Sequence, residues 1–257
     1  MINLKLIALL AQNDLRARYR GSVLGKFWLI VTPLVMLLLY SLVFSTIFKA
    51  RWETLGASVY SHYAIVLFPG LMMYQLMMDV LQKGGTAYDT YAPITTKLNI
   101  SALNLILAGV LASLIPFWIT IAIWYLIVAV LFSFSMQGLS LVLIITLAFS
   151  GFCVGLALLS TVFGALLKDW VQLLGMFGMG LLFISPVLYP VDHLPKLLQQ
   201  VIYLNPLSYF VDMIRQSAFQ PDTAFSPSLL IPVLMMTMLV LIAGAGLERV
   251  LARFTHE

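Results

Sequence analysis

Four basic side chains stand directly before the first long apolar run of the 257-residue sequence, namely Arg16, Arg18, Arg20 and Lys26. Guanidinium and ammonium groups bind phosphate, and the order Gly21…Gly25-Lys26 resembles the end of a P-loop. A P-loop needs four residues between its glycines and then Lys-Ser/Thr, so that backbone amides cradle phosphate and the hydroxyl reaches Mg²⁺. Here three residues separate the glycines, and Phe27 stands at the hydroxyl position. The segment is therefore not a P-loop, and any ATPase is another chain.

Other reactive side chains are sparse and poorly placed for catalysis. Cys153 is the only cysteine and lies in an apolar run, and the three histidines are far apart, so neither an intrachain disulfide nor a metal site is expected. Asp79 is the only carboxylate inside the apolar ranges given below, whereas ion-coupled transporters need ionisable groups within the bundle. We expect no catalytic site and no cofactor in this chain, and an energy source outside its spans.

The composition is that of a membrane protein. Hydrophobic residues make up 62% and charged residues 9%, with a mean hydropathy of +1.03, whereas soluble domains carry about 25% charged residues. A span needs about 20 apolar residues, and 98–167, which has no charged residue and no histidine, fits two long helices. Six spans are predicted, at 27–48, 62–81, 102–132, 138–167, 170–190 and 228–247. We therefore expect one all-α integral membrane domain over residues 1–257.

Lys and Arg gather on one side of this predicted topology. With six spans both termini share a side, which holds ten of these residues against four on the other, and the positive-inside rule places that side in the cytoplasm. Residues 1–22 are expected to form an amphipathic helix on the membrane surface. Arg16 and Arg20, four apart on one face with Arg18 pointing away, would contact anionic headgroups there.

Two connecting segments have structure of their own. The cytoplasmic segment 82–101 is expected to be a loop, punctuated by Gly84-Gly85 and Pro93, with room for one short coupling helix. Residues 191–227 carry two runs with apolar residues at i, i+3, i+4 and i+7, separated by Asn205-Pro206. This spacing predicts two short periplasmic helices, which either lie in the membrane interface or gate a pathway.

Aromatic and small side chains pattern two of the spans. Tyr40, Phe44 and Phe48 recur every four residues. This stripe either packs against another helix or lines a pathway, where flat rings would stack on sugars. Gly151 and Gly155 form a G-x-x-x-G pair, which indicates close helix packing.

The ordered motifs resemble a known family. Arg18–Pro33 has the pattern R-Y-R-G-S-x-L-G-x-x-W-x-x-x-x-P, Ser185–Pro190 is SPVLYP, and Lys168-Asp169 and Asn205-Pro206 stand at the expected turns. This set is similar to type-2 ABC exporter permeases, specifically those that export O-antigen, capsule and teichoic-acid polymers. One departure lies after the coupling segment, where residues 97–101 lack the family's Lys-x-x-Phe-Pro-like sequence.

The resemblance implies a permease homodimer in the bacterial inner membrane, with ATP and Mg²⁺ on two separate ATPase subunits and no nucleic-acid partner. The cargo would be a polysaccharide on a polyprenyl-pyrophosphate lipid, whose pyrophosphate Arg16 and Arg20 would meet among the membrane lipids. The aromatic pathway lining would comprise Tyr40, Phe44, Phe48, Phe183 and Tyr189. ATPase coupling would involve Gly85, Tyr88, Asp89, Tyr91 and Lys97. The periplasmic gate would involve Leu198, Asn205, Pro206 and Phe210. Export of a drug or small lipid stays open as the alternative, as does the choice among O-antigen, capsule and teichoic-acid polymers.

Overall fold

The fold is all-helical throughout the part of the chain that the computed structural model describes. Described are residues 3–47, 62–98, 101–132, 135–191 and 194–220, and 234–246 except 236 and 245. The elements are α1 (Leu4–Arg18), η1 (Gly25–Phe27), α2 (Trp28–Tyr40), η2 (Ser41–Ile47), α3 (Tyr63–Leu98), α4 (Ala102–Phe132), α5 (Met136–Leu166), α6 (Trp170–Ile184), α7 (Lys196–Ile202) and α8 (Pro206–Phe219). The turn at η1 is a 3₁₀-helix, and η2 continues α2 as a π-helix.

Within the described residues, four helical stretches are long and apolar enough to cross a membrane. They are Gly25–Phe44, Tyr63–Tyr91, Ala102–Phe132 and Met136–Leu166. The helix α6 is apolar but has only 15 residues. The bounds of α4 coincide with the predicted span 102–132, and α5 begins two residues before its prediction. An all-helical membrane protein is thus confirmed, while the count of six spans stays a prediction.

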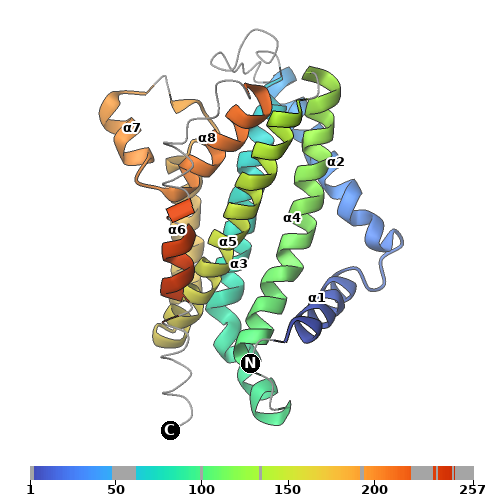
Figure 1. Cartoon of the computed structure of the whole chain (residues 1–257), viewed down its shortest axis with the longest axis vertical. Coiled ribbons are helices and arrows are strands. Elements are labelled where there is room, and N and C mark those ends of the chain that lie inside the picture. Colours follow the sequence, from blue (N-terminus) through green and yellow to red (C-terminus); the bar gives the residue numbers. More distant parts are fainter. Residues whose placement is uncertain are drawn as a thin grey trace.

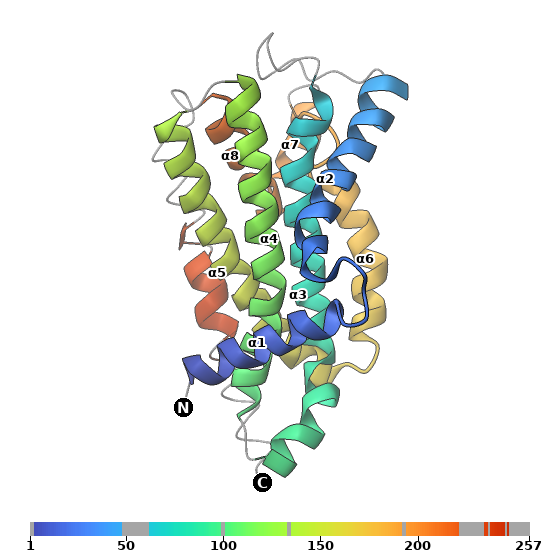
Figure 2. The same ribbon diagram turned by 90° about the vertical axis from the view of Figure 1, so that its right-hand side faces the viewer.

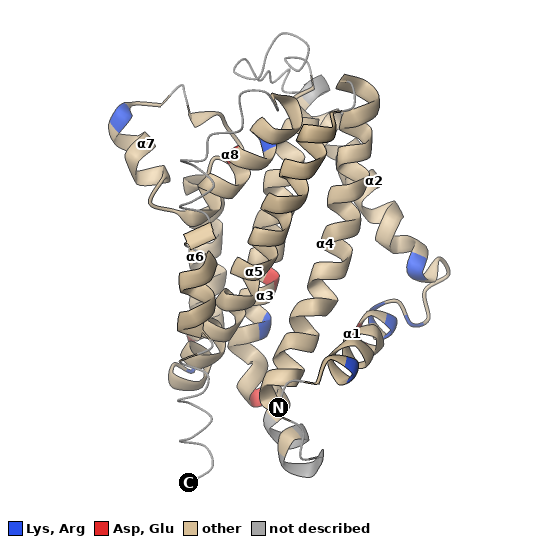
Figure 3. Cartoon of the chain, in the orientation of Figure 1, with Lys and Arg blue, Asp and Glu red and all other residues tan. Residues whose placement is uncertain are grey.

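The long helices form a bundle with smaller elements at its two ends (Figure 1). Helix α1 crosses one end of the bundle at a steep angle, as Figure 2 shows, while α7 and α8 lie at the opposite end. In Figure 3 most of the described Lys and Arg residues lie toward the α1 end, and Lys196 of α7 and Arg215 of α8 lie at the other. This distribution matches the predicted grouping of the charges.

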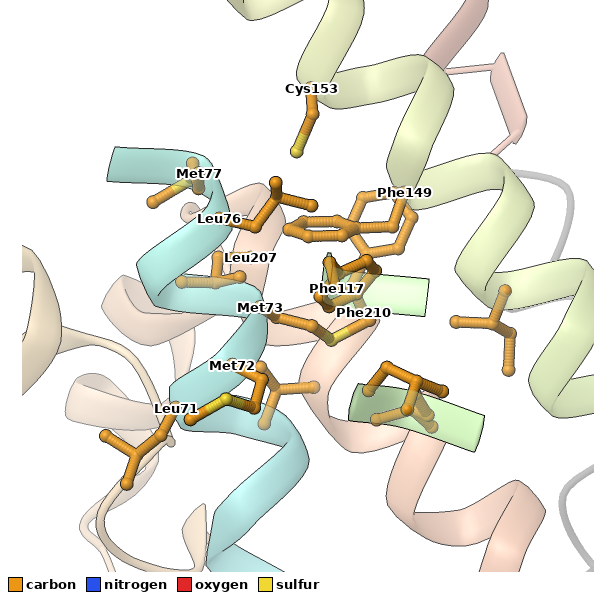
Figure 4. Close-up of a cluster of buried hydrophobic side chains, with 14 of the residues drawn as sticks. Leu71, Met72, Met73, Leu76, Met77, Phe117, Phe149, Cys153, Leu207 and Phe210 are labelled. Atoms are coloured by element: carbon orange, nitrogen blue, oxygen red, sulfur yellow. The ribbon is translucent and has the colours of Figure 1, made fainter. Parts of the chain in front are cut away.

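Helix α3 is the centre of the bundle and is buried along most of its span. Its Met73 and Leu76 side chains point toward the rings of Phe117, Phe149 and Phe210 (Figure 4). Pro69 has no N–H to donate to the carbonyl of Ile65 one turn earlier. The indole Nε1 of Trp124 on α4 donates to that carbonyl at 2.8 Å. A proline inside α3 is therefore compensated by a side chain of a neighbouring helix.

The predicted loop at 82–101 is wrong, because α3 continues as a helix to Leu98. Gly84 and Gly85 are buried at contacts with other helices and do not break this one. A Cβ on Gly84 would overlap the backbone carbonyl of Ala157 on α5, and one on Gly85 would lie 3.0 Å from the Trp170 ring of α6. The two glycines are needed for close approach between helices, which sequence reasoning mistook for a turn signal.

The G-x-x-x-G pair of α5 also lies at a close helix contact, as predicted. A Cβ on Gly155 would lie 2.8 Å from the backbone N of Leu241, and one on Gly151 would lie 3.2 Å from the Thr237 side chain. Conversely, a Cβ on Gly244 would lie 2.7 Å from the Gly155 carbonyl oxygen. The described helical residues of 234–246 therefore pack backbone to backbone against α5.

Candidate functional site

A basic cavity of about 560 Å³ opens where α1, the start of α2 and α4 meet. Arg16 and Gln12 line it from α1, Lys26 lines it from η1, and Leu111 and Ile115 form its apolar side. Two cations and an amide beside leucine and isoleucine fit a ligand with an anionic head and an apolar tail. The sequence prediction included Arg16 and missed Lys26, although Lys26 belongs to the same cluster of basic residues.

Arg20 does not lie with Arg16 as predicted. Helix α1 ends at Arg18, Tyr19 caps it, and Arg20 follows in an exposed turn that Gly21 completes with a φ of +81°. The predicted helix over residues 1–22 is therefore too long at its C-terminal end. The prediction that Arg16 and Arg20 project from one face of this helix is wrong. A positive φ suits glycine, which explains why the chain turns there.

A cluster of charged and polar groups joins α1 to α3 and α4. Lys83 of α3 lies 3.4 Å from an oxygen of Asp79 and 4.0 Å from Asp14 of α1, and its ammonium donates to the Gly109 carbonyl at 3.0 Å. Arg18 pairs with Asp14 at 3.6 Å. Ser113 of α4 donates to Asp79 and accepts from Lys83.

This cluster borders a second cavity of about 250 Å³, which Arg18, Asp79 and Ser113 help to line. Sequence reasoning noted Asp79 but not its partners. The available signal was the spacing of Asp79 and Lys83, four residues apart within one turn of a helix.

The aromatic stripe of the first span packs against α3. The Tyr40 ring lies 6.5 Å from Phe44 and 6.4 Å from Phe68, and the Phe44 ring stacks on Tyr63 at 5.6 Å. Tyr40 and Phe44 are both half-buried. Of the two interpretations left open, helix packing is thus realised, and the partial exposure leaves one side of each ring accessible. Phe48 lies outside the described residues.

The predicted aromatic residues at the end of α6 are connected to the aromatic stripe of the first span by Tyr63 of α3. The Tyr63 hydroxyl donates to the carbonyl of Leu188, the residue before Tyr189. Tyr189 in turn donates to the Phe183 carbonyl at 2.6 Å, and the Phe183 side chain is exposed. The predicted lining residues of the first and fifth spans are therefore linked at one end of the bundle.

The residues predicted to couple to an ATPase divide into buried and exposed. Gly85 is buried in the contact with α6, Tyr91 is half-buried, and Tyr88 and Asp89 are exposed on the last turns of α3. The side chain of Lys97 lies outside the described residues. Only Tyr88 and Asp89 of the described set offer a surface for a partner.

The predicted gate residues lie in and between α7 and α8. Asn205 caps α8 by accepting from the Leu207 N–H at 3.1 Å, and its amide donates to Ser185 at 2.6 Å, while Pro206 is the first residue of α8. The break at Asn205-Pro206 is therefore confirmed. Leu198 is exposed on α7, whereas Phe210 is fully buried against Phe149 and Phe152 and belongs to the core.

Arg215 of α8 is a functional candidate that sequence reasoning missed. Its side chain is 2% exposed and donates to the carbonyls of Val66 at 2.8 Å, Pro186 at 2.5 Å and Val187 at 2.7 Å. Burial lowers the pKa of Arg215 to about 10, which the nearby Asp212 carboxylate partly opposes. The guanidinium is therefore charged at neutral pH and holds α8 against α3 and the segment after α6.

Comparisons with known proteins agree over most of the chain. Residues 5–219, which reach from α1 to the end of α8, match the family model described as ABC-2 type transporter. Two proteins of Klebsiella pneumoniae, each named O-antigen export system permease protein RfbA, are 24% identical over 210 residues and 23% identical over 213. Both alignments cover 80% of this chain and 77% of the relative. The protein of the same name from Myxococcus xanthus is 27% identical over 97 residues, which are 38% of this chain and 34% of that protein.

Proposed function

The chain belongs to the ABC-2 type transporter family, and from that premise we propose that it is the membrane permease of an ATP-driven polysaccharide exporter. Its cargo is a lipid-linked polymer of the O-antigen type. The observation that carries the proposal is the alignment of four-fifths of the chain with two O-antigen export permeases. The apolar membrane-spanning helices support a role in translocation rather than in catalysis.

The proposed topology has six spans with both termini in the cytoplasm of a bacterial inner membrane. The asymmetry of Lys and Arg between the two ends of the bundle supports this orientation. Helix α1 then lies on the cytoplasmic face and the helices α7 and α8 on the periplasmic face. A homodimer encloses the pathway, and the exposed apolar surfaces of α2 and α6 offer faces for the second copy and for lipid.

ATP and Mg²⁺ bind to two partner ATPase subunits in this proposal. Those subunits dock against the end of α3, where Tyr88 and Asp89 are exposed. Because α1 is tied to α3 by the Lys83 cluster, movement at the docking surface reaches α1 and the basic cavity. The cavity lined by Arg16 and Lys26 binds the pyrophosphate of the lipid carrier, and Arg20 contacts headgroups from the exposed turn.

The polymer passes the half-exposed aromatic rings near the opposite end of the bundle. Tyr40, Phe44, Phe183 and Tyr189 offer rings for stacking on sugars. Stacking is suited to a sliding polymer because it is tolerant of position along the chain. The α7–α8 pair closes the pathway, and Arg215 anchors its second helix.

Deletion of this chain tests the proposal directly. Cells that lack it should keep undecorated lipid-linked polymer on the cytoplasmic side and lose surface polysaccharide, while a plasmid copy restores export. Normal surface polysaccharide in the deletion strain, combined with new sensitivity to a drug, would instead support export of a drug or small lipid.

A further inference from the structure

A polar groove lies between α7 and α8. These two helices lie at the end of the bundle away from α1 (Figure 1). Its volume is about 650 Å³, within the range of roughly 300–1,000 Å³ that small-molecule sites occupy. The groove is lined on the α7 side by Lys196, Gln200 and Tyr203, and on the α8 side by Tyr209, Asp212 and Gln216. The roles predicted from the sequence use none of these six residues.

The walls of the groove are held in place by their own contacts. The Tyr203 hydroxyl donates to one Asp212 oxygen at 2.8 Å, and the other Asp212 oxygen lies 4.0 Å from the Arg215 guanidinium. The rings of Tyr203 and Tyr209 lie side by side, with centroids 5.3 Å apart. Because Arg215 is itself fixed by three backbone carbonyls, the carboxylate and the ring pair are positioned before any ligand arrives.

The chemistry of the lining suits a sugar better than an anion. The rings of Tyr203 and Tyr209 are tilted by 53° to one another, so each ring can offer its own flat face to the C–H groups of a sugar. The amides of Gln200 and Gln216 both donate to and accept from hydroxyl groups. Asp212 accepts from hydroxyls and repels phosphate. Lys196 is the one cation among the described lining residues, and it opposes a carboxylate across the same groove.

We propose that the α7–α8 groove is a binding site for uncharged sugar units, separate from the basic cavity and from the aromatic stripe. This proposal rests on the proposed function for the identity of the glycan that occupies the groove. At the periplasmic end of the permease, such a site holds emerging sugar units and disfavours their return into the pathway.

Binding of free polysaccharide to the purified permease tests the site. The probe is the polysaccharide released by mild acid from the lipid-linked pool of the producing cells, with dextran of similar length as the comparison. Gln200→Leu/Gln216→Leu should weaken binding about tenfold, since it removes two amides that bond hydroxyls. Tyr209→Ala should weaken it similarly through loss of a ring. Leu197→Ala, an exposed change on α7 outside the groove, should bind as the unaltered chain does.

The outcomes separate this site from the proposed function. Weaker binding in the glutamine variant, with unaltered thermal stability, supports the site. Equal binding by all variants, or no binding by the unaltered chain, overturns it even where deletion of the chain abolishes surface polysaccharide. Loss of binding to anionic lipid vesicles instead of polysaccharide in the same variants identifies a headgroup site and overturns the proposal as well. Normal surface polysaccharide after deletion of the chain refutes the proposed function itself.

Discussion

Replacing Arg215 by methionine should destabilise the protein strongly, because it removes a buried cation that three carbonyls share. Hydrogen bonds from charged donors contribute about 1.5–3 kcal/mol each, so three bonds sum to roughly 4.5–9 kcal/mol before relaxation. The Val66 carbonyl lies within α3 and the other two lie in the segment after α6, where partial rearrangement is available. We therefore expect the free energy of unfolding to fall by about 3–5 kcal/mol, which is the cost of removing one partner from a buried charged network.

The assay uses the chain's own cysteine as reporter. Cys153 is fully buried, so a thiol-reactive fluorescent dye reports unfolding as the purified permease is heated. For a chain of this size a loss of about 3–5 kcal/mol corresponds to roughly 6–20 °C in Tm, at about 2–4 °C per kcal/mol. The Tm of Arg215→Lys should lie between those of the unaltered protein and Arg215→Met, because an ammonium reaches fewer of the three carbonyls than a planar guanidinium does.

Lys196→Met is the matched control, since it removes an exposed cation from the neighbouring helix α7 and should change stability by no more than about 0.5 kcal/mol. An Arg215→Met protein that melts together with this control would refute the idea that Arg215 anchors α8. Early dye labelling at low temperature in every variant would show that Cys153 is accessible in the folded chain and contradict the packing of α5.

Three further predictions concern other parts of the molecule. Gly155→Ala should lower Tm through overlap with the backbone near Leu241, at a cost of about 1–3 kcal/mol in the free energy of unfolding. Gly175→Ala should not lower Tm, because Gly175 has open space around it. Equal Tm values for the two variants would contradict the close α5 contact. Lys83→Met leaves Asp14 and Asp79 without their shared cation, so amide hydrogen exchange in α1 should accelerate relative to that in α4. Unchanged exchange in α1 would mean that the cluster does not hold this helix. Arg16→Ala/Lys26→Ala should weaken binding to vesicles that contain a polyprenyl pyrophosphate more than Arg20→Ala does, and a larger loss in the Arg20 variant would place the phosphate in the exposed turn instead.

The long apolar helices were predictable because their signal is dense and local. A 70-residue stretch without a charged residue or histidine leaves only one place for a polar turn, so the bounds of α4 and α5 follow closely. The break at Asn205-Pro206 was predictable for a similar reason, because the proline cannot continue a preceding helix and the asparagine caps the next one.

Features that depend on tertiary contacts were not predictable in the same way. Gly84-Gly85 has the composition of a turn, and only the approach of α5 and α6 shows that the two glycines serve helix packing. Arg215 is a charged residue in a short amphipathic helix, a pattern typical of a solvated face. Its partners are backbone carbonyls of segments far away in sequence, and these carry no side-chain signature.

The proposed function requires this chain to move lipid-linked polysaccharide when a separate ATPase drives it. The most direct measurement reconstitutes the chain with its copurified ATPase subunit in proteoliposomes and follows the accessibility of a lipid-linked glycan to an enzyme outside. We expect that ATP changes this accessibility and that the glycan stimulates ATP hydrolysis. Unchanged accessibility in the presence of ATP, with hydrolysis stimulated by a drug or a small lipid instead, would contradict it.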